Sequence, residues 1–326
     1  MSVPTISVAI PAYQASRWIA ETLDAVLAQA SPADEVIVVD DGSTDGTAEL
    51  AEAYGPPVRV VRQANRGAAG AYNRGFQEAT GDFVAKCPAD DLWVPEKLAW
   101  QREALARHPQ ADVLFGLARD FGVVEGDLPG PPGEGLLDNA TLLPALYRAN
   151  CFAAPSALVR RSLHARLGGF REDLRIGEDY DFWLRAVEAG ARLYYDPRLL
   201  VRLRKHGGNL SMQALATWEL NHRIHEAHAD AVGDPALVRR TLSDDLTRIG
   251  RCRLGLGRAR EAREAYRASL RARPTAAALA ATAALSLRRR RARPPAAPRR
   301  GGGRVIGQRQ ARGGVIRTMS SSRRYP

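Results

Sequence analysis

The feature that most constrains this fold is a regular alternation of short apolar runs and helical segments over the first 120 residues. Five mostly apolar runs are separated by stretches whose apolar residues recur at helical spacing. The runs are residues 6–10, 35–39, 58–61, 82–85 and 111–117. Strands that are apolar along their length are typical of sheets covered by helices on both faces. The pattern therefore predicts an α/β fold with a mostly parallel sheet and flanking helices.

The second half of the chain is less regular. Residues 122–138 are rich in Gly and Pro and are predicted to form a loop, and helical periodicity extends from residue 237 to 287. Residues 256–274 resemble half of a tetratricopeptide unit, and one such unit cannot bury its own apolar face. We therefore expect three parts: a domain over residues 1–231, a helical extension of tetratricopeptide-like hairpins over 232–287, and a disordered basic tail over 288–326.

The net charge of +11 comes from that tail. Residues 288–326 contain thirteen Arg, no Lys and no acidic residue, and subtracting those charges from +11 leaves −2 for residues 1–287. A basic segment of low complexity is typical of disordered tails. Such a tail could contact an anionic membrane surface peripherally, although an uninvolved disordered extension is the slightly favoured interpretation. Since the predicted folded part is nearly neutral, we expect no specific binding to nucleic acid.

Cysteine usage and apolar runs suggest where the protein is found. Three widely spaced cysteines, Cys87, Cys151 and Cys252, fit neither a disulfide framework nor a zinc site, and suit a reducing compartment. The N-terminus shows no signal-peptide pattern, and the longest apolar run, residues 276–285, is too short to span a bilayer. We therefore expect a cytoplasmic protein, located at the inner face of the membrane if the tail docks there.

Acidic residues gather where the predicted strands end. Asp40 and Asp41 follow the second apolar run, and Asp90 and Asp91 follow the fourth. Because the carboxyl ends of parallel strands meet at one edge of a sheet, we expect both pairs to line the same rim. Either pair alone is more often a helix cap or a solvated turn. Two pairs at equivalent strand ends instead favour a site for Mg²⁺ or Mn²⁺, which joins carboxylates to a phosphorylated ligand.

Two further clusters of titratable residues occur in the second half. Glu178 and Asp179 open a predicted helix, where acids in the first turn are favourable on electrostatic grounds alone. His222, His225 and His228 occur at i, i+3 and i+6 of a later helix, and the third histidine lies well around the helix from the first two. We interpret that segment as a surface helix and not as a metal site.

Several motifs occur in the order found in the family 2 glycosyltransferases of the GT-A fold, and the sequence resembles that family over residues 4–215. The motifs are SVAIPAY at 7–13, VVDDGSTD at 38–45, NRG at 65–67 and at 73–75, GDFV at 81–84, ADDLWVPEKL at 89–98, GEDYDFWLR at 177–185 and RKHGGNLS at 204–211. Each motif is weak alone, but the ordered set is specific. The resemblance implies a Rossmann-like GT-A domain that uses a nucleotide-sugar.

The resemblance also implies a nucleotide-sugar site at the first two motifs. Pro11, Tyr13 and Asp41 would contact the nucleobase, with Tyr13 stacking on it. Asp40 would help to build the same pocket, and Asn65 would bind the nucleotide-sugar as well. These residues do not discriminate between UDP-, dTDP- and GDP-sugars, so the base of the donor stays open.

Metal and catalytic roles are implied for the later motifs. Asp91 would ligate Mn²⁺ or Mg²⁺ directly, and Asp90 would contact the ribose or support the metal. His206 would approach the diphosphate or the metal. Glu178 and Asp179 match the acidic pair that supplies the general base, and we favour Asp179 without excluding Glu178.

The implied activity is that of an inverting, metal-dependent glycosyltransferase acting on a glycan, lipid-linked or protein acceptor, in cell-surface polysaccharide, glycolipid or glycoconjugate synthesis. One departure is Pro88, which stands where many members of the family carry another acid. The alternative is therefore a non-catalytic nucleotide- or glycan-binding relative with a degraded metal site. A dehydrogenase is disfavoured, because residues 67–70 do not form the dinucleotide fingerprint after the first strand.

Overall fold

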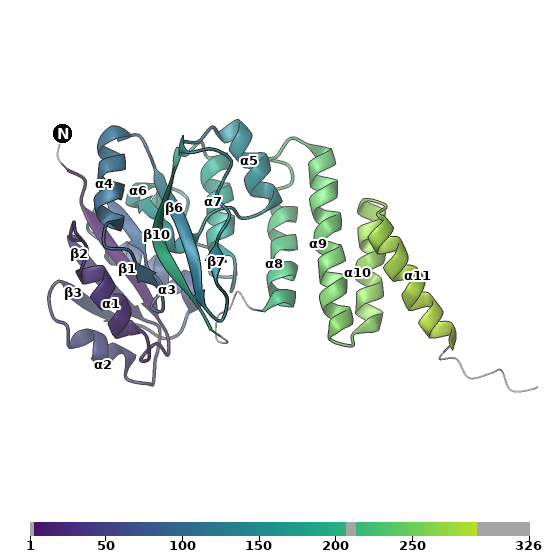
Figure 1. The fold of residues 1–326 in the computed structure, drawn as a ribbon, viewed down its shortest axis with the longest axis horizontal. Coiled ribbons are helices and arrows are strands. Elements are labelled where there is room, and N and C mark those ends of the chain that lie inside the picture. The colour runs from purple at the N-terminus through teal and green to yellow at the C-terminus, as the bar shows by residue number, and fades with distance from the viewer. Residues whose placement is uncertain (1–2, 207–212, 292–326) are drawn as a thin grey trace, which may run out of the picture. The chain divides into compact units, whose positions relative to one another are not determined.

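A computed structural model of the chain describes residues 3–206 and 213–291 (Figure 1). Residues 1–285 belong to one compact unit built on a single mixed sheet. Its strands are β1 (Ile6–Ala12), β2 (Glu35–Asp40), β3 (Val58–Arg62), β4 (Phe83–Lys86), β5 (Leu92–Trp93), β6 (Val113–Gly122), β7 (Gly126–Asp127), β8 (Gly135–Leu136), β9 (Leu158–Arg160) and β10 (Leu193–Lys205). The five predicted apolar runs all form strands of this sheet, with boundaries shifted by a few residues.

The strand order places the predicted acidic turns on neighbouring strands. The order is β3-β2-β1-β4-β9-β6-β10-β5, with β7 paired to β6 and β8 paired to β10. β1, β2, β3 and β4 are parallel, and so are β6 and β10, whereas β9 runs antiparallel between β4 and β6. Since β2 and β4 both flank β1, the carboxyl ends of these three strands lie side by side.

Helices cover both faces of the sheet, as the apolar strands predicted. In chain order they are α1 (Ile19–Leu27), α2 (Thr47–Glu52), α3 (Gly67–Glu78), α4 (Lys97–Arg107), α5 (Asn139–Arg148), α6 (Arg161–Arg166) and α7 (Glu178–Glu188). One buried cluster joins α3, α5, α6 and α7 to the sheet, and a second joins α1 and α4 to the opposite face. Along β1, Ala9 belongs to the first cluster while Val8 and Ile10 belong to the second, as alternating strand positions require.

Four more helices follow the sheet: α8 (Ala214–Ala227), α9 (Pro235–Gly255), α10 (Ala259–Ala272) and α11 (Ala276–Arg291). α9 and α10 pack tightly, since Ser243 and Ser269 share a hydrogen bond of 2.9 Å and the Tyr266 ring fills the space beside Gly250. The division at residues 231 and 287 stays a prediction. α11 continues to Arg291, and the rest of the expected basic tail, residues 292–326, lies outside the described residues.

The prediction of a surface helix around the three histidines was wrong. His225 is 2% exposed and His228 is 6% exposed, because α8 lies between the helices of the domain and α9. His225 Nδ1 lies 2.6 Å from Asp245 in α9, and its Nε2 lies 2.8 Å from the Tyr180 hydroxyl in α7. The buried residues Leu220, Ile224, His225 and His228 lie on one side of this helix, and helical spacing alone could not show that this side was the covered one.

Within the described segments, we find no helix with the length and apolar character needed to cross a membrane.

Candidate active site

The residues predicted to bind the nucleotide lie at the carboxyl ends of β1 and β2. Ala12 and Asp40 are register partners, Pro11 is half-buried in β1, and Tyr13 follows the strand with 57% of its surface exposed. Asp40 is buried, and its Oδ1 has no hydrogen-bond partner among the described residues. A buried oxygen without a partner is costly, and a ligand or a water molecule would satisfy it.

Asp41 has a structural role that the sequence did not reveal. Its carboxylate accepts hydrogen bonds from the Gln63 side chain and from the backbone N–H groups of Arg66 and Gly67, each at 2.8 Å. It thereby fixes the loop before α3 and the first residue of that helix. Asn65 lies in this loop and is exposed. The predicted contact of Asp41 and Asn65 with a nucleotide stays a prediction.

The second acidic pair sits in a tight turn after β4. The Asp91 N–H donates to the carbonyl of Pro88 at 3.4 Å. The Thr22 hydroxyl of α1 donates to the carbonyls of Ala89 and Asp91 at 2.9 and 3.0 Å. Pro88 thus shapes the turn through its backbone, and the fold of this turn does not require an acid at that position.

The end of β10 closes over this turn and brings the three predicted metal ligands together. The backbone N–H of Arg204 donates to Asp91 Oδ1 at 2.8 Å, and its Nε donates to the Asp90 carbonyl at 2.9 Å. His206 Nε2 lies 3.0 Å from Asp90 Oδ2, and the His206 ring stacks on Trp18 with centroids 5.7 Å apart. Asp90, Asp91 and His206 therefore gather although the histidine is distant in sequence.

Burial dominates the electrostatics of Asp91. Together with the neighbouring charge of Asp90 it raises the pKa of Asp91 well above its usual range, although the Arg204 N–H and the charges of Lys205 and Arg204 act to lower it. The two nearby cations each pair with another acid, since Arg204 lies 2.6 Å from Glu21 and Lys205 lies 3.3 Å from Asp120. A bound cation would therefore be favourable here.

The ligand types fit an open divalent site. Among the described residues, no group of three or more His, Cys, Asp or Glu is arranged to hold a metal ion by itself. Mg²⁺ and Mn²⁺, however, commonly take one or two carboxylates and complete their shell with phosphate oxygens and water. Asp90 and Asp91 can supply those carboxylates, and His206 is close enough to assist.

The third acidic pair occupies the first turn of α7. Gly177 precedes it with φ of +75°, in the left-handed region that glycine adopts readily. The Glu178 side chain is 13% exposed, and Asp179 is half-buried and accepts a hydrogen bond of 3.3 Å from Asn150. Burial and the charge of Asp179 raise the pKa of Glu178 to about 7, whereas Lys86 acts to lower it.

Lys86 is a neighbour of this pair that sequence analysis missed. It ends β4 and is 1% exposed, and its Nζ lies 4.0 Å from Glu178 Oε1. A signal was present, because this lysine closes a run of apolar strand residues just before the acidic turn. A charge in a buried strand requires a partner, which draws attention to acids elsewhere in the chain.

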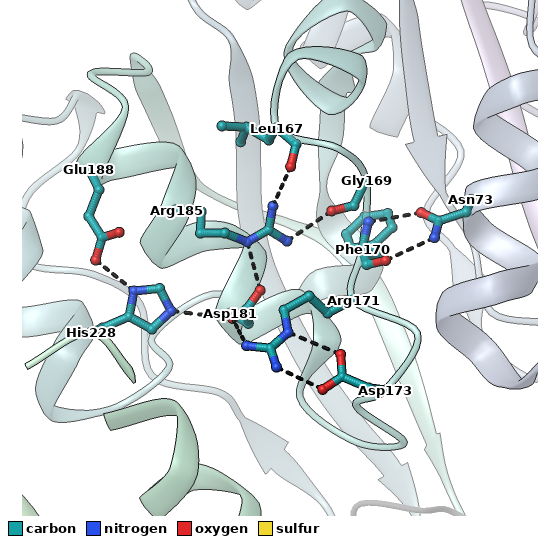
Figure 2. Close-up of polar contacts among 10 residues, drawn as sticks. All are labelled: Asn73, Leu167, Gly169, Phe170, Arg171, Asp173, Asp181, Arg185, Glu188 and His228. Carbon is teal, nitrogen blue, oxygen red and sulfur yellow. Dashed lines mark hydrogen bonds and ion pairs between the residues drawn. The ribbon is translucent and has the colours of Figure 1, made fainter. Parts of the chain in front are cut away.

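Side chains from α3 and α7 fix the loop that leads into α7 (Figure 2). Asn73 clamps Phe170, donating to its carbonyl and accepting from its N–H, both at 2.8 Å. Arg185 donates to the carbonyls of Leu167 and Gly169, also at 2.8 Å. The NRG motif at residues 73–75 therefore positions the approach to α7.

Helix α8 supports α7 on another side, as Figure 2 also shows. His228 lies 2.6 Å from Glu188 and 3.3 Å from Asp181, and Asp181 accepts a 2.7 Å hydrogen bond from Arg185. Burial opposes protonation of His228, but its hydrogen bonds to Asp181 and Glu188 outweigh that effect and raise its pKa to about 9. A protonated His228 thus joins α8 to the helix that carries Glu178 and Asp179.

The family model described as "Glycosyl transferase family 2" matches residues 7–167, which include the parallel strands β1 to β4 and the two acidic pairs at their ends. These residues therefore belong to glycosyltransferase family 2, as their motifs indicated.

Curated relatives agree with this placement. An uncharacterized glycosyltransferase of Rickettsia typhi is 27% identical over 220 residues, which are 65% of this chain and 67% of the relative. The putative glycosyltransferase EpsE of Bacillus subtilis is 29% identical over 63% of this chain and 74% of its own length. A chondroitin synthase of Pasteurella multocida is 27% identical over 68% of this chain, but the match spans only 23% of that protein.

Solved structures share the fold. TarS of S. aureus (residues 1–349, in complex with UDP-GlcNAc) superposes with a TM-score of 0.67 at 21% identity, over 86% of this chain and 89% of that chain. The mannosyltransferase PcManGT of Pyrobaculum calidifontis, in complex with GDP-Man and Mn²⁺, gives a TM-score of 0.57 at 23% identity, over 88% and 81%. The predicted GT-A fold is thereby confirmed.

Proposed function

We propose that this glycosyltransferase moves a sugar from a nucleoside-diphosphate sugar to an acceptor hydroxyl and inverts the anomeric centre. The carrying observation is that Lys86 ends β4, the strand that leads into the Asp90–Asp91 turn, and that its Nζ lies 4.0 Å from Glu178 Oε1. The charges of both later pairs also act on the buried Tyr72 of α3, where burial is the main cause that raises the pKa of the hydroxyl. One pair can thus hold the diphosphate end of a donor while the other meets the acceptor.

The donor would occupy the carboxyl ends of β1, β2 and β4. Tyr13 is exposed enough to stack on a base. Near Tyr13, Asp40 Oδ1 is a buried acceptor that has no hydrogen-bond partner among the described residues. Pro11, Asp41 and Asn65 complete the proposed nucleotide contacts. TarS binding UDP-GlcNAc and PcManGT binding GDP-Man support a nucleotide-sugar, with UDP-, dTDP- and GDP-sugars as the candidates.

Asp179 is the proposed general base. Its carboxylate would take the proton of the acceptor hydroxyl as that oxygen attacks the anomeric carbon and the nucleoside diphosphate leaves. A single displacement inverts the centre and needs no carboxylate nucleophile. Asn150, 3.3 Å from Asp179, would orient the base.

Asp91, with Asp90 and His206, would hold Mn²⁺ or Mg²⁺. The ion would stabilise negative charge on the leaving diphosphate as a Lewis acid. The Mn²⁺ bound by PcManGT supports this assignment. In the protein itself, the Thr22 hydroxyl and the Arg204 guanidinium donate to carbonyls of the Asp90–Asp91 turn, and the Arg204 N–H donates to Asp91 Oδ1.

The proposed acceptor is a glycan, a lipid-linked saccharide or a protein, in the synthesis of cell-surface polysaccharide or a glycoconjugate. The similarity to chondroitin synthase supports a polysaccharide. All three cysteines are free thiols, which supports the proposal of a cytoplasmic protein. The basic tail proposed to contact a membrane lies outside the described residues.

A nucleotide panel tests the function. UDP-, dTDP- and GDP-sugars are titrated calorimetrically with and without Mn²⁺, and donor consumption is followed by release of nucleoside diphosphate. We expect one donor to bind at least about tenfold more tightly with Mn²⁺, and Asp91→Asn to remove that gain. Binding without turnover on any acceptor would favour the non-catalytic relative, and no Mn²⁺ dependence for any nucleotide would contradict the proposed metal site.

A further inference from the structure

A cation is buried where the sheet meets the acidic end of α7. Lys86 Nζ lies 4.1 Å from the ring centroid of Tyr72, 4.2 Å from Phe170 and 5.8 Å from Trp183. Aromatic faces attract ammonium groups, and the attraction is greatest where water is excluded. These three rings come from α3, from the loop before α7 and from α7 itself. They therefore hold the ammonium group of Lys86 against the N-terminal end of α7.

The rings alone do not account for a buried charge, because an ammonium group without an anion is strongly disfavoured in a protein interior. The anion is Glu178, whose Oε1 lies 4.0 Å from Nζ. Burial lowers the pKa of Lys86, and the charges of Glu178 and Asp179 act against that effect. The lysine and the two acids therefore stabilise one another's charged forms.

Other groups around Glu178 bring no competing positive charge. Among the described residues, the charges that act on Glu178 are those of Asp179 and Lys86. Tyr72 stays neutral because its pKa is raised. His164 of α6 also stays neutral, since burial, helped by the charges of Lys86 and Arg185, lowers its pKa to about 3. Asn150, the partner of Asp179, is uncharged.

We propose, on the basis of the proposed function, that Lys86 is the internal counter-ion of the Glu178–Asp179 pair. Buried among these aromatic rings, Lys86 favours the ionised form of Glu178 and holds that side chain beside the proposed base. It is a positioning residue, because it acts through Glu178 and does not contact the substrate.

The effect on the base follows from the coupling of adjacent acids. Glu178 and Asp179 lose their protons as a unit, and a proton held by Glu178 can be shared with Asp179 and make it a weaker base. Removing the positive charge of Lys86 raises the pH at which that proton leaves. The pair then becomes fully ionised only at higher pH, and the rate at neutral pH falls although the site is otherwise intact.

The test compares two buried lysines in the full-length protein. Lys86→Met removes the counter-ion. Lys97→Met is the matched control, because Lys97 is also fully buried over an aromatic ring, 4.1 Å from Trp93, but binds Gln101 and not Glu178. We expect the acid limb of the kcat–pH profile to move upward by about one pH unit in Lys86→Met, with the rate recovering at high pH. In Lys97→Met we expect the acid limb of the kcat–pH profile to stay at the same pH as in the wild type.

A Glu178→Gln background shows whether Lys86 acts through Glu178. The shift caused by Lys86→Met should disappear there, because the shared proton is gone. An equal loss of rate at every pH, or the same shift in the Glu178→Gln background, would overturn the inference. If Lys86→Met does not fold, Lys86→Gln removes the charge at similar length and takes its place.

A second measurement separates this inference from the proposed function. The side-chain carboxyl carbon of Glu178, labelled with ¹³C and assigned with Glu178→Gln, is titrated by NMR in the wild type and in Lys86→Met. An upward displacement of its midpoint in Lys86→Met supports the counter-ion even if no donor is turned over. An unchanged midpoint overturns it even if the enzyme is active.

Discussion

The two later acidic pairs differ in how their charge is offset. Beside Asp90 and Asp91, the cations Arg204 and Lys205 are already paired with Glu21 and Asp120. Beside Glu178, the neighbouring cation is Lys86, which is buried against the Tyr72 ring. The proposed Mn²⁺ or Mg²⁺ would add positive charge at the first pair, whereas Lys86 already lies beside the second.

The pairs also differ in how they are held. The Thr22 hydroxyl and the Arg204 guanidinium donate to carbonyls of the Asp90–Asp91 turn, and the Arg204 N–H donates to the Asp91 carboxylate. The helix that carries Glu178 is held by ion pairs among side chains, above all those of Arg185 and His228.

The largest expected effect separates the two acids of α7. Asp179→Asn removes the proposed base and should lower kcat by about 10²–10⁴-fold, because general base catalysis contributes that much. Glu178→Gln should lower kcat by only about tenfold, since the base remains and only its neighbour's charge is lost. Initial rates of nucleoside diphosphate release at saturating donor measure both.

Donor affinity provides the control for that comparison. Both variants should bind the donor with Mn²⁺ as tightly as the wild type, because neither acid belongs to the proposed nucleotide or metal site. The reverse order of kcat losses would assign the base to Glu178 and remove the division of roles between the two acids.

A smaller effect is expected at His228, which joins α8 to α7. Its pKa is about 9 in the folded protein, above its ordinary value of 6.5, so the stability it adds is complete below pH 6.5 and is lost as pH rises through 9. His228→Gln should lower the free energy of unfolding by about 1–3 kcal/mol at pH 6, as loss of a charged hydrogen-bonding partner does.

Urea unfolding of the wild type and His228→Gln at pH 6 and pH 10 measures this effect. The difference between the two proteins should shrink at pH 10, where His228 is neutral in both states. A difference independent of pH would mean that His228 stabilises α7 by packing alone. The kcat of the variant at 25 °C reports separately whether α8 influences the acidic pair.

The sequence predicted the fold and the position of two acidic pairs at strand ends, because both depend on local pattern. Apolar runs gave the strands, and Asp40, Asp41, Asp90 and Asp91 follow directly from where those strands end. The confirmed family accounts for the placement of His206, which no local pattern links to Asp90.

Contacts between distant segments escaped prediction. Lys86 ends a strand, where a lysine is normally solvated, but Phe170 and Trp183 from the second half of the chain join Tyr72 around it. His225 and His228 were assigned to the surface because their partners in α7 and α9 could not be inferred from helical spacing. Charge burial is a property of the assembled core, and a single segment carries little information about it.

The smallest expected effect concerns Pro88, and it tests whether the first pair depends on an external cation. Pro88→Asp adds a third acid to a turn whose proline contributes through its carbonyl, which any residue supplies. The added charge should lower the melting temperature without Mn²⁺, through repulsion from Asp90 and Asp91. It should also tighten Mn²⁺-dependent donor binding about two- to fivefold, because the cation then offsets more charge.

Pro88→Asn is the matched control, since it also removes the proline ring but adds no charge. Melting temperatures and donor affinities of both variants are measured with and without Mn²⁺. If Pro88→Asp and Pro88→Asn behave alike, the ring and not the missing acid matters at this position. If Pro88→Asp is destabilised and Mn²⁺ does not restore it, the ion does not bind at this turn, and Asp90–Asp91 would no longer differ from Glu178–Asp179 in needing an external cation.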